Sequence, residues 1–244
     1  MLWITGVCSY RYFADFSEVE INEDTETASS MQLGYEGLQG EAGMRMFGET
    51  DWHRGWKQAF PLEMRERTFL NKSEGYCHRA DVFTACGTAI EFQNSPISLG
   101  ELISREGFYS KMVWVVNGAK FKGFRVLKNL PSMEDPGILG FEFSHTANLT
   151  MVRKCDILAG MDKPKVLTFH HPELRSLKRT GHLYSFRWLQ PHRVWYQARF
   201  PIVIDFGGYF LYELRHRPQL NGDYAYLCMV PKKDFIARYI TVQI

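Results

Sequence analysis

The stretch TACGTAIEFQNSPIS, residues Thr84 to Ser98, decides how this chain is expected to fold. It reads as a tight turn followed by an apolar strand, but that strand carries a carboxylate and an amide, Glu91 and Gln93. Side chains alternate along a strand, so these two polar groups point to one face and their apolar neighbours to the other. The role of these two polar side chains on an otherwise apolar strand has to be explained.

The turn in this stretch predicts the partner of Glu91. If residues 85–87 form a three-residue hairpin loop, Gly87 takes the left-handed position that such loops need. Counting outwards from the loop then places Asp81 directly opposite Glu91. Like charges directly opposite on a sheet destabilise it, so two resolutions are considered: a shared proton that raises one pKa, or a divalent cation between the carboxylates. Oxygen ligands of this kind suit Mg²⁺ or Mn²⁺.

The elements around this hairpin predict a helix, three strands, a helix and a strand. A helical pattern runs from Glu41 to Phe60, where Pro61 ends it. Ser98 with Glu101 three residues later is a capping-box signature for a second helix over 99–110, and an apolar strand follows at 112–116. The predicted strands of the hairpin region are 67–70, 77–83 and 88–93. On the first helix, Glu49, His53 and Lys57 are spaced to share one face.

The composition predicts one or two globular domains in an ordinary cytoplasmic protein. Apolar residues make up 45% and charged residues 23% of 244, which excludes disordered and low-complexity classes. Five scattered cysteines indicate reduced thiols and no zinc module. No stretch is long and apolar enough to predict a membrane span.

The net charge of +2 hides an uneven distribution. Residues 15–49 hold nine acidic side chains and one basic one, whereas residues 162–199 hold eight basic and two acidic. A basic second half indicates an anionic partner or simply a solvated surface. Within it, residues 177–188 interleave basic and aromatic side chains, as in proteins that bind nucleic acid, and the candidates are Lys178, Arg179, Tyr184 and Arg187. An ordinary amphipathic strand has the same pattern.

The stretch HRADVFTACGTAIEFQNSPIS, continued by REGFYSKMVWVVNG, resembles the nuclease core of the competence protein CoiA-like family, a branch of the PD-(D/E)XK nuclease superfamily. The upstream ETDWHRGWKQAFP resembles the first helix of that family, and the later FHHPEL and PIVIDFG resemble its C-terminal part. The clear match covers residues 49–118.

The resemblance implies an α/β fold with a restriction-endonuclease-like α-β-β-β-α-β core, a mixed sheet and a β-rich C-terminal extension. It divides the chain into an acidic segment over 1–40, a nuclease core over 41–118 and an extension over 119–244. The implied activity is Mg²⁺-dependent or Mn²⁺-dependent hydrolysis of DNA.

The resemblance also assigns roles to individual residues. Asp81 and Glu91 are expected to bind the metal ion, with Glu49 as an additional acid. Gln93 stands where the superfamily usually has lysine and is expected to orient the attacking water.

Supporting roles near this site stay open between function and structure. His53 is expected to contact water or phosphate, or to be an ordinary helix-surface residue. Gln93 carries no charge where the superfamily usually has lysine, so Lys57 or Arg105 is considered as the source of that positive charge. Arg105 and Tyr109 face the scissile strand, or Arg105 simply pairs with Glu101.

Two other functional classes are considered. One is a DNA-binding or recombination accessory protein with a silent site, and the other is an interaction subunit of a complex that acts on foreign DNA.

Overall fold

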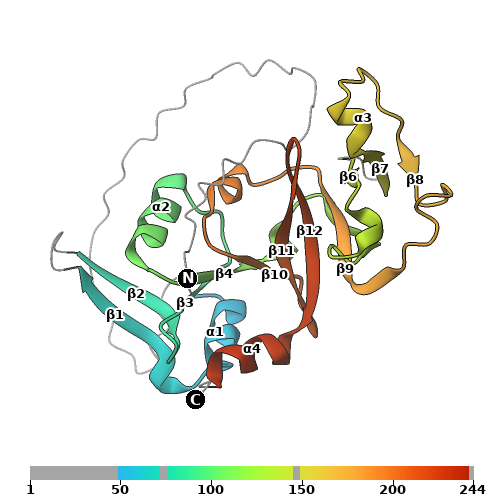
Figure 1. The fold of residues 1–244 in the computed structure, drawn as a ribbon. Helices are drawn as coiled ribbons and strands as arrows, with labels where there is room; N and C mark the ends of the chain where they lie inside the picture. The colour runs from blue at the N-terminus through green and yellow to red at the C-terminus, as the bar shows by residue number, and fades with distance from the viewer. Residues whose placement is uncertain (1–48, 72–75, 145–148, 242–244) are drawn as a thin grey trace, which may run out of the picture.

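The computed structural model describes residues 49–71, 76–144 and 149–241, and these form an α/β structure around one large mixed sheet (Figure 1). The nine strands of this sheet lie in the order β1-β2-β3-β4-β10-β11-β12-β9-β5. The predicted N-terminal acidic segment, residues 1–40, lies outside the described residues.

The first half of the described chain follows the predicted order of elements. After the first helix and a short 3-10 turn come three antiparallel strands, a second helix and a strand that runs parallel to β3. The bounds are α1 Asp51–Gln58, η1 Leu62–Met64, β1 Arg65–Asn71, β2 Tyr76–Phe83, β3 Ala89–Gln93, α2 Leu99–Phe108 and β4 Met112–Asn117. As predicted, Ser98 caps α2, and its hydroxyl accepts a hydrogen bond from the N–H of Glu101.

Helix α1 starts ten residues later than the sequence pattern predicted. The side chain of Thr50 accepts a hydrogen bond from the N–H of His53 and so caps a helix that begins at Asp51. Glu49 therefore precedes the helix instead of lying within it. The prediction gave too much weight to apolar spacing and missed the threonine cap. Residues 41–48 lie outside the described part of the chain.

The hairpin between β2 and β3 has the predicted register. The N–H of Thr84 bonds to the carbonyl of Thr88, and Val82 pairs with Ile90. Gly87 has φ of 79°, which is the left-handed conformation expected at the end of the loop. Extending this register by one residue brings Asp81 level with Glu91.

The second half of the chain continues the same sheet. Strand β10 pairs in parallel with β4, and β11, β12, β9 and β5 follow in antiparallel order. Its further bounds are η2 Gly118–Lys120, β5 Phe124–Pro131, η3 Pro136–Ile138, β6 Phe141–Phe143, β7 Thr150–Arg153, α3 Lys154–Leu158, β8 Leu167–Thr168, β9 Arg179–Trp188, η4 Arg193–Gln197, β10 Ile202–Asp205, β11 Phe210–Gln219, β12 Gly222–Pro231 and α4 Lys232–Ile240. The segment over 119–244 is thus hydrogen-bonded to the first half through β4.

Helices cover the two faces of the sheet differently (Figure 1). Trp56 of α1 and Phe235 of α4 pack with Ile90 and Phe92 on one face. Leu102 of α2 packs on the other face with a cluster that includes Trp114. A small sheet of β6, β7 and β8 closes a third core against β9 and β12.

A buried aspartate fastens α1 to the C-terminal half. The indole N–H groups of Trp52 and Trp56 both donate to Oδ2 of Asp205, at 3.0 and 2.8 Å. Asp205 is the last residue of β10 and also accepts from the N–H of Gly207. This contact sets the position of α1, and hence of His53 and Lys57, relative to the sheet.

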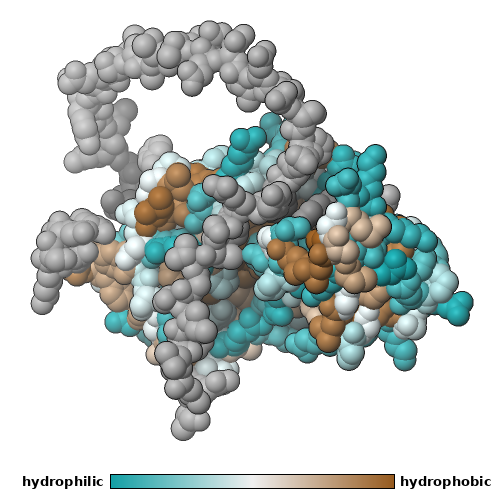
Figure 2. Space-filling model, turned by 45° about the horizontal axis from the view of Figure 1, so that its top comes forward, coloured by the Kyte–Doolittle hydropathy of each residue, from teal (hydrophilic) through white to brown (hydrophobic). Residues whose placement is uncertain are grey.

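The visible surface in Figure 2 mixes hydrophilic and apolar residues, with the apolar ones in separate patches. Exposed apolar side chains include Leu99 and Ile103 on α2. Among the described residues, no helix is both long and apolar enough to cross a membrane.

Candidate active site

The candidate site lies where β2 and β3 part. The backbone pairing of these strands ends at Val82 and Ile90, and beyond it the carboxylate of Asp81 replaces the backbone as the hydrogen-bond partner of β3. Its Oδ2 accepts a hydrogen bond of 2.9 Å from the N–H of Phe92. Asp81 therefore stands at the fork of the sheet, one residue beyond the last backbone pair.

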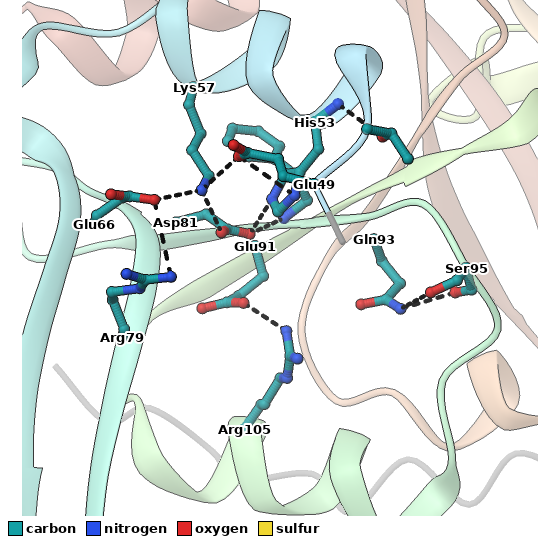
Figure 3. Close-up of polar contacts among 12 residues, drawn as sticks. Glu49, His53, Lys57, Glu66, Arg79, Asp81, Glu91, Gln93, Ser95 and Arg105 are labelled. Atoms are coloured by element: carbon teal, nitrogen blue, oxygen red, sulfur yellow. Dashed lines mark hydrogen bonds and ion pairs between the residues drawn. The ribbon is translucent and has the colours of Figure 1, made fainter. Parts of the chain in front are cut away.

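Two side chains of α1 contact Asp81 (Figure 3). Nε2 of His53 lies 2.9 Å from Oδ2, and Nζ of Lys57 lies 3.7 Å from Oδ1. Burial opposes ionisation of Asp81. The bond from His53, the N–H of Phe92 and the charge of Lys57 outweigh it, so the pKa lies below its usual value. Asp81 is thus a stable carboxylate.

Glu91 has the opposite character, although it lies on the neighbouring strand. It is only 1% exposed, and burial together with the charge of Asp81 raises its pKa from 4.5 to about 8. Arg105 opposes the shift through a hydrogen bond of 2.8 Å from Nη1 to Oε2. The other oxygen, Oε1, is buried without a hydrogen-bond partner among the described residues. The backbone N–H of Asp81 also favours the ionised form of Glu91.

The two carboxyl groups bond in different directions (Figure 3). Asp81 contacts side chains from α1, and Glu91 contacts Arg105 from α2. The sequence offered a shared proton or a divalent cation as ways to relieve their repulsion. The cationic side chains Lys57 and Arg105 reduce the repulsion between the two carboxyl groups. The raised pKa of Glu91 means that this group keeps its proton to a higher pH.

Lys57 collects three carboxylates around its ammonium group. Its Nζ lies 2.7 Å from Oε1 of Glu49, 2.7 Å from Oε1 of Glu66 and 3.7 Å from Asp81. Burial lowers the pKa of Lys57, but these carboxylates more than compensate and raise it above 10.5. His53 is also near Glu49, with Nδ1 3.8 Å from Oε1.

Glu66 is a site residue that the sequence reasoning missed. It has φ of 51°, an uncommon left-handed conformation for a residue with a side chain, and it lies next to the Asp81 position in the β1–β2 ladder. The signal available in the sequence was a glutamate between two arginines in a strand, Arg65–Glu66–Arg67. That pattern does not indicate which way the carboxylate turns.

Gln93 lies at the edge of the site and is half-buried. Its amide nitrogen donates to the carbonyl of Ser95 at 2.8 Å, and Figure 3 shows its amide oxygen on the side of Glu91. The expected role in orienting water stays a prediction. The fixed amide presents an oxygen to the site and no positive charge.

Arg105 and Tyr109 differ from the pair that the sequence predicted. Arg105 bonds to Glu101, as the structural alternative expected, and also to Glu91, whereas its contact with a scissile strand stays a prediction. Tyr109 is not on the helix but follows it as the C-cap, and its hydroxyl lies 2.7 Å from Nδ1 of His78. Burial raises the pKa of Tyr109 above its usual range, which fits a packed, neutral phenol.

The predicted nucleic-acid contacts lie away from the carboxylates. Lys178, Arg179 and Arg187 are exposed on or beside β9, and Arg179 lies over the ring of Phe169. Tyr184 is half-buried and donates to the carbonyl of Gly181. In the order of the sheet, β4, β10, β11 and β12 lie between β3 and β9. The fold therefore does not bring these four residues together with Asp81.

The charges of the site leave room for a divalent cation. Five acidic side chains lie around three that carry a fixed positive charge (Glu49, Glu66, Asp81, Glu91 and Glu101 against Lys57, Arg79 and Arg105). No three His, Cys, Asp or Glu residues in the described ranges are arranged to hold a metal ion by themselves. Mg²⁺ commonly uses only one or two carboxylates and keeps several waters. The residues that would hold such an ion are Asp81 and Glu91.

Comparison of the chain with protein-family models, with curated proteins and with solved structures found no significant match.

Proposed function

We propose that this protein is a metal-dependent nuclease that hydrolyses DNA phosphodiester bonds at Asp81 and Glu91. The observation that carries the proposal is the buried Oε1 of Glu91, unpaired within the described residues, beside a second carboxylate. An ionised Glu91 lacks enough positive charge around it, and a divalent cation supplies that charge. Burying a charge without such compensation is unfavourable.

Each side chain of the site has a separate role in hydrolysis, which follows from its position. When bound, the metal ion neutralises charge on the phosphate and lowers the pKa of coordinated water. Asp81 and Glu91 hold the ion, and Gln93 offers its amide oxygen at the edge. Lys57 and Arg105 stabilise negative charge that builds on the phosphate. His53, oriented by Asp81, holds a proton beside the reacting groups.

The proposal agrees with the resemblance to CoiA-like nucleases. The observed order of helix, three strands, helix and strand is the order expected of a restriction-endonuclease-like core. Lys57, from the first helix, stands 3.7 Å from Asp81, so it supplies the positive charge that Gln93 cannot. DNA as partner accords with the basic second half, and binding is then expected to weaken steeply with salt. The described cysteines are free thiols, which supports action in the reducing cytoplasm.

Cleavage of single-stranded and double-stranded DNA with Mg²⁺ or Mn²⁺ tests this function. Wild type is compared with Asp81→Asn and Glu91→Gln, which keep the shape of each side chain. The matched control is Asp234→Asn, an exposed carboxylate on α4. We expect cleavage by wild type and the control only. Equal cleavage by all four proteins overturns the site assignment.

A second candidate is a DNA-binding accessory protein without cleavage. The observation in its favour is that Asp81 and Glu91 already have cationic partners, His53, Lys57 and Arg105. Retained DNA binding in gel-shift experiments, with no cleavage under any divalent metal, would select this function.

A further inference from the structure

A strained residue interrupts the edge strand beside the candidate site. Glu66 of β1 has φ of 51°, and it is the one residue other than glycine with a positive φ in the described part of the chain. Its paired neighbours, Arg65 and Arg67, place it level with Asp81 on β2. A side chain in this conformation costs energy and persists only where other contacts hold it. The contacts of Glu66 therefore indicate what the strain is retained for.

The side chain of Glu66 turns onto Lys57 (Figure 3). Its Oε1 accepts a hydrogen bond of 2.7 Å from Nζ of Lys57, and Oε1 of Glu49 lies 2.7 Å from the same nitrogen. Arg79 is a more distant partner, with Nη2 4.0 Å from Oε1 of Glu66. The side chain of Lys57 is only 10% exposed, so its ammonium depends on acceptors within the protein. Glu66 supplies one of these acceptors from the edge of the sheet.

The ammonium of Lys57 is held apart from Asp81. Nζ lies 3.7 Å from Oδ1 of Asp81, which is beyond hydrogen-bonding distance. The other oxygen of Asp81, Oδ2, accepts a hydrogen bond of 2.9 Å from the N–H of Phe92 and lies 2.9 Å from Nε2 of His53. Lysine has a flexible four-carbon stem, so Lys57 would close the gap to Oδ1 if nothing else attracted it. Its two glutamate partners therefore decide where the ammonium lies.

We infer that Glu66 is a positioning residue that keeps the ammonium of Lys57 away from Asp81, so that Oδ1 of Asp81 stays open to a cation. A lysine in direct contact with Oδ1 would take the place of that cation. The position of Lys57 follows from the contacts of Glu66 and Glu49, whereas the use of Oδ1 by a metal ion rests on the proposed function.

Removing the carboxylate of Glu66 should let Lys57 move onto Asp81. At an effective dielectric constant of about 20, shortening the distance from 3.7 Å to about 2.8 Å strengthens their attraction by an amount that corresponds to about tenfold in an equilibrium constant. A cation that binds Asp81 must then displace the ammonium, so the affinity for the cation falls by about the same factor.

Glutamine and glycine at position 66 separate the effect of position from the effect of charge. Both variants lack the negative charge, but Glu66→Gln retains an oxygen that accepts a hydrogen bond from Lys57, whereas Glu66→Gly has none. Glycine also adopts a positive φ without strain, so this variant is expected to fold. Glu66→Ala, which keeps the strain of wild type and lacks the acceptor, repeats the test if Glu66→Gly does not fold.

Crystal structures in EDTA measure the position of Lys57 without metal or activity. In Glu66→Gly we expect Nζ within about 3 Å of Oδ1 of Asp81, and in Glu66→Gln we expect Nζ where it lies in wild type. Electron paramagnetic resonance then measures the affinity for Mn²⁺, which should be about tenfold weaker in Glu66→Gly than in Glu66→Gln.

An unmoved Lys57 in Glu66→Gly, or an equal and measurable Mn²⁺ affinity in the two variants, would overturn the inference. Absence of Mn²⁺ binding and of cleavage in wild type would instead reject the metal-dependent nuclease. Movement of Lys57 onto Asp81 in Glu66→Gly would even then support Glu66 as the residue that separates them.

Discussion

Replacing Glu91 with glutamine tests the electrostatic basis of the site. Glutamine keeps the shape and an acceptor for Arg105, but it cannot ionise. In the folded protein the pKa of Glu91 is raised from 4.5 to about 8. The protonated form therefore contributes stability that is fully present below about pH 4.5 and is lost as the pH rises to about 8. The Glu91→Gln variant has no ionisable group at this position, so its stability does not fall with pH in this way.

The size of the effect follows from the slope of about 1.36 kcal/mol per pH unit for one proton. From about pH 5.5 to about pH 7.5, wild type loses roughly 3 kcal/mol of unfolding free energy through this group. For a chain of 244 residues this corresponds to roughly 6–12 °C in Tm. Because Glu91 is 1% exposed, solvent screening reduces the figure little.

Thermal denaturation in EDTA at the two pH values measures the difference. We expect the Tm of Glu91→Gln to rise relative to wild type as the pH increases. Glu101→Gln is the control, because Glu101 also bonds to Arg105 but is exposed. Parallel Tm curves for wild type and Glu91→Gln would refute a buried carboxyl group with a raised pKa.

Three further changes test the fold and the basic segment. Asp205→Asn, against Asp234→Asn as control, should lower the unfolding free energy by roughly 1–3 kcal/mol in denaturant titrations, since one buried and one half-buried indole donor lose an acceptor. Gly118→Ala should cost about 1–3 kcal/mol, because its new Cβ would lie 2.5 Å from Ile204, whereas Gly100→Ala on exposed α2 should stabilise by up to about 1 kcal/mol. Arg179→Gln should reduce the salt slope of DNA binding by about one unit in anisotropy titrations, and an unchanged slope would remove Arg179 from the interface.

The hairpin around Gly87 was predictable because its information is local. A loop length, a glycine and the alternation of side chains are enough to fix the register that places Asp81 level with Glu91. The Ser98 cap is local in the same way. The start of α1 was wrong because apolar spacing continues upstream of the residue that caps the helix, Thr50.

The remainder of the site depends on contacts between distant parts of the chain. Trp52 and Trp56 reach Asp205 across about 150 positions, and nothing in the sequence joins them. The parallel pairing of β4 with β10 is equally remote, so the growth of one continuous sheet was not foreseen. Glu66 turns toward Lys57 through a backbone conformation that no residue pattern signals.

The most direct measurement is a Mn²⁺ titration followed by electron paramagnetic resonance at about pH 7.5, where an uncharged Glu91 must release its proton to bind. The account predicts one bound ion per chain in wild type, with binding lost in Asp81→Asn and in Glu91→Gln and retained in Asp234→Asn. Absence of binding in wild type, or equal binding in all four proteins, would contradict it.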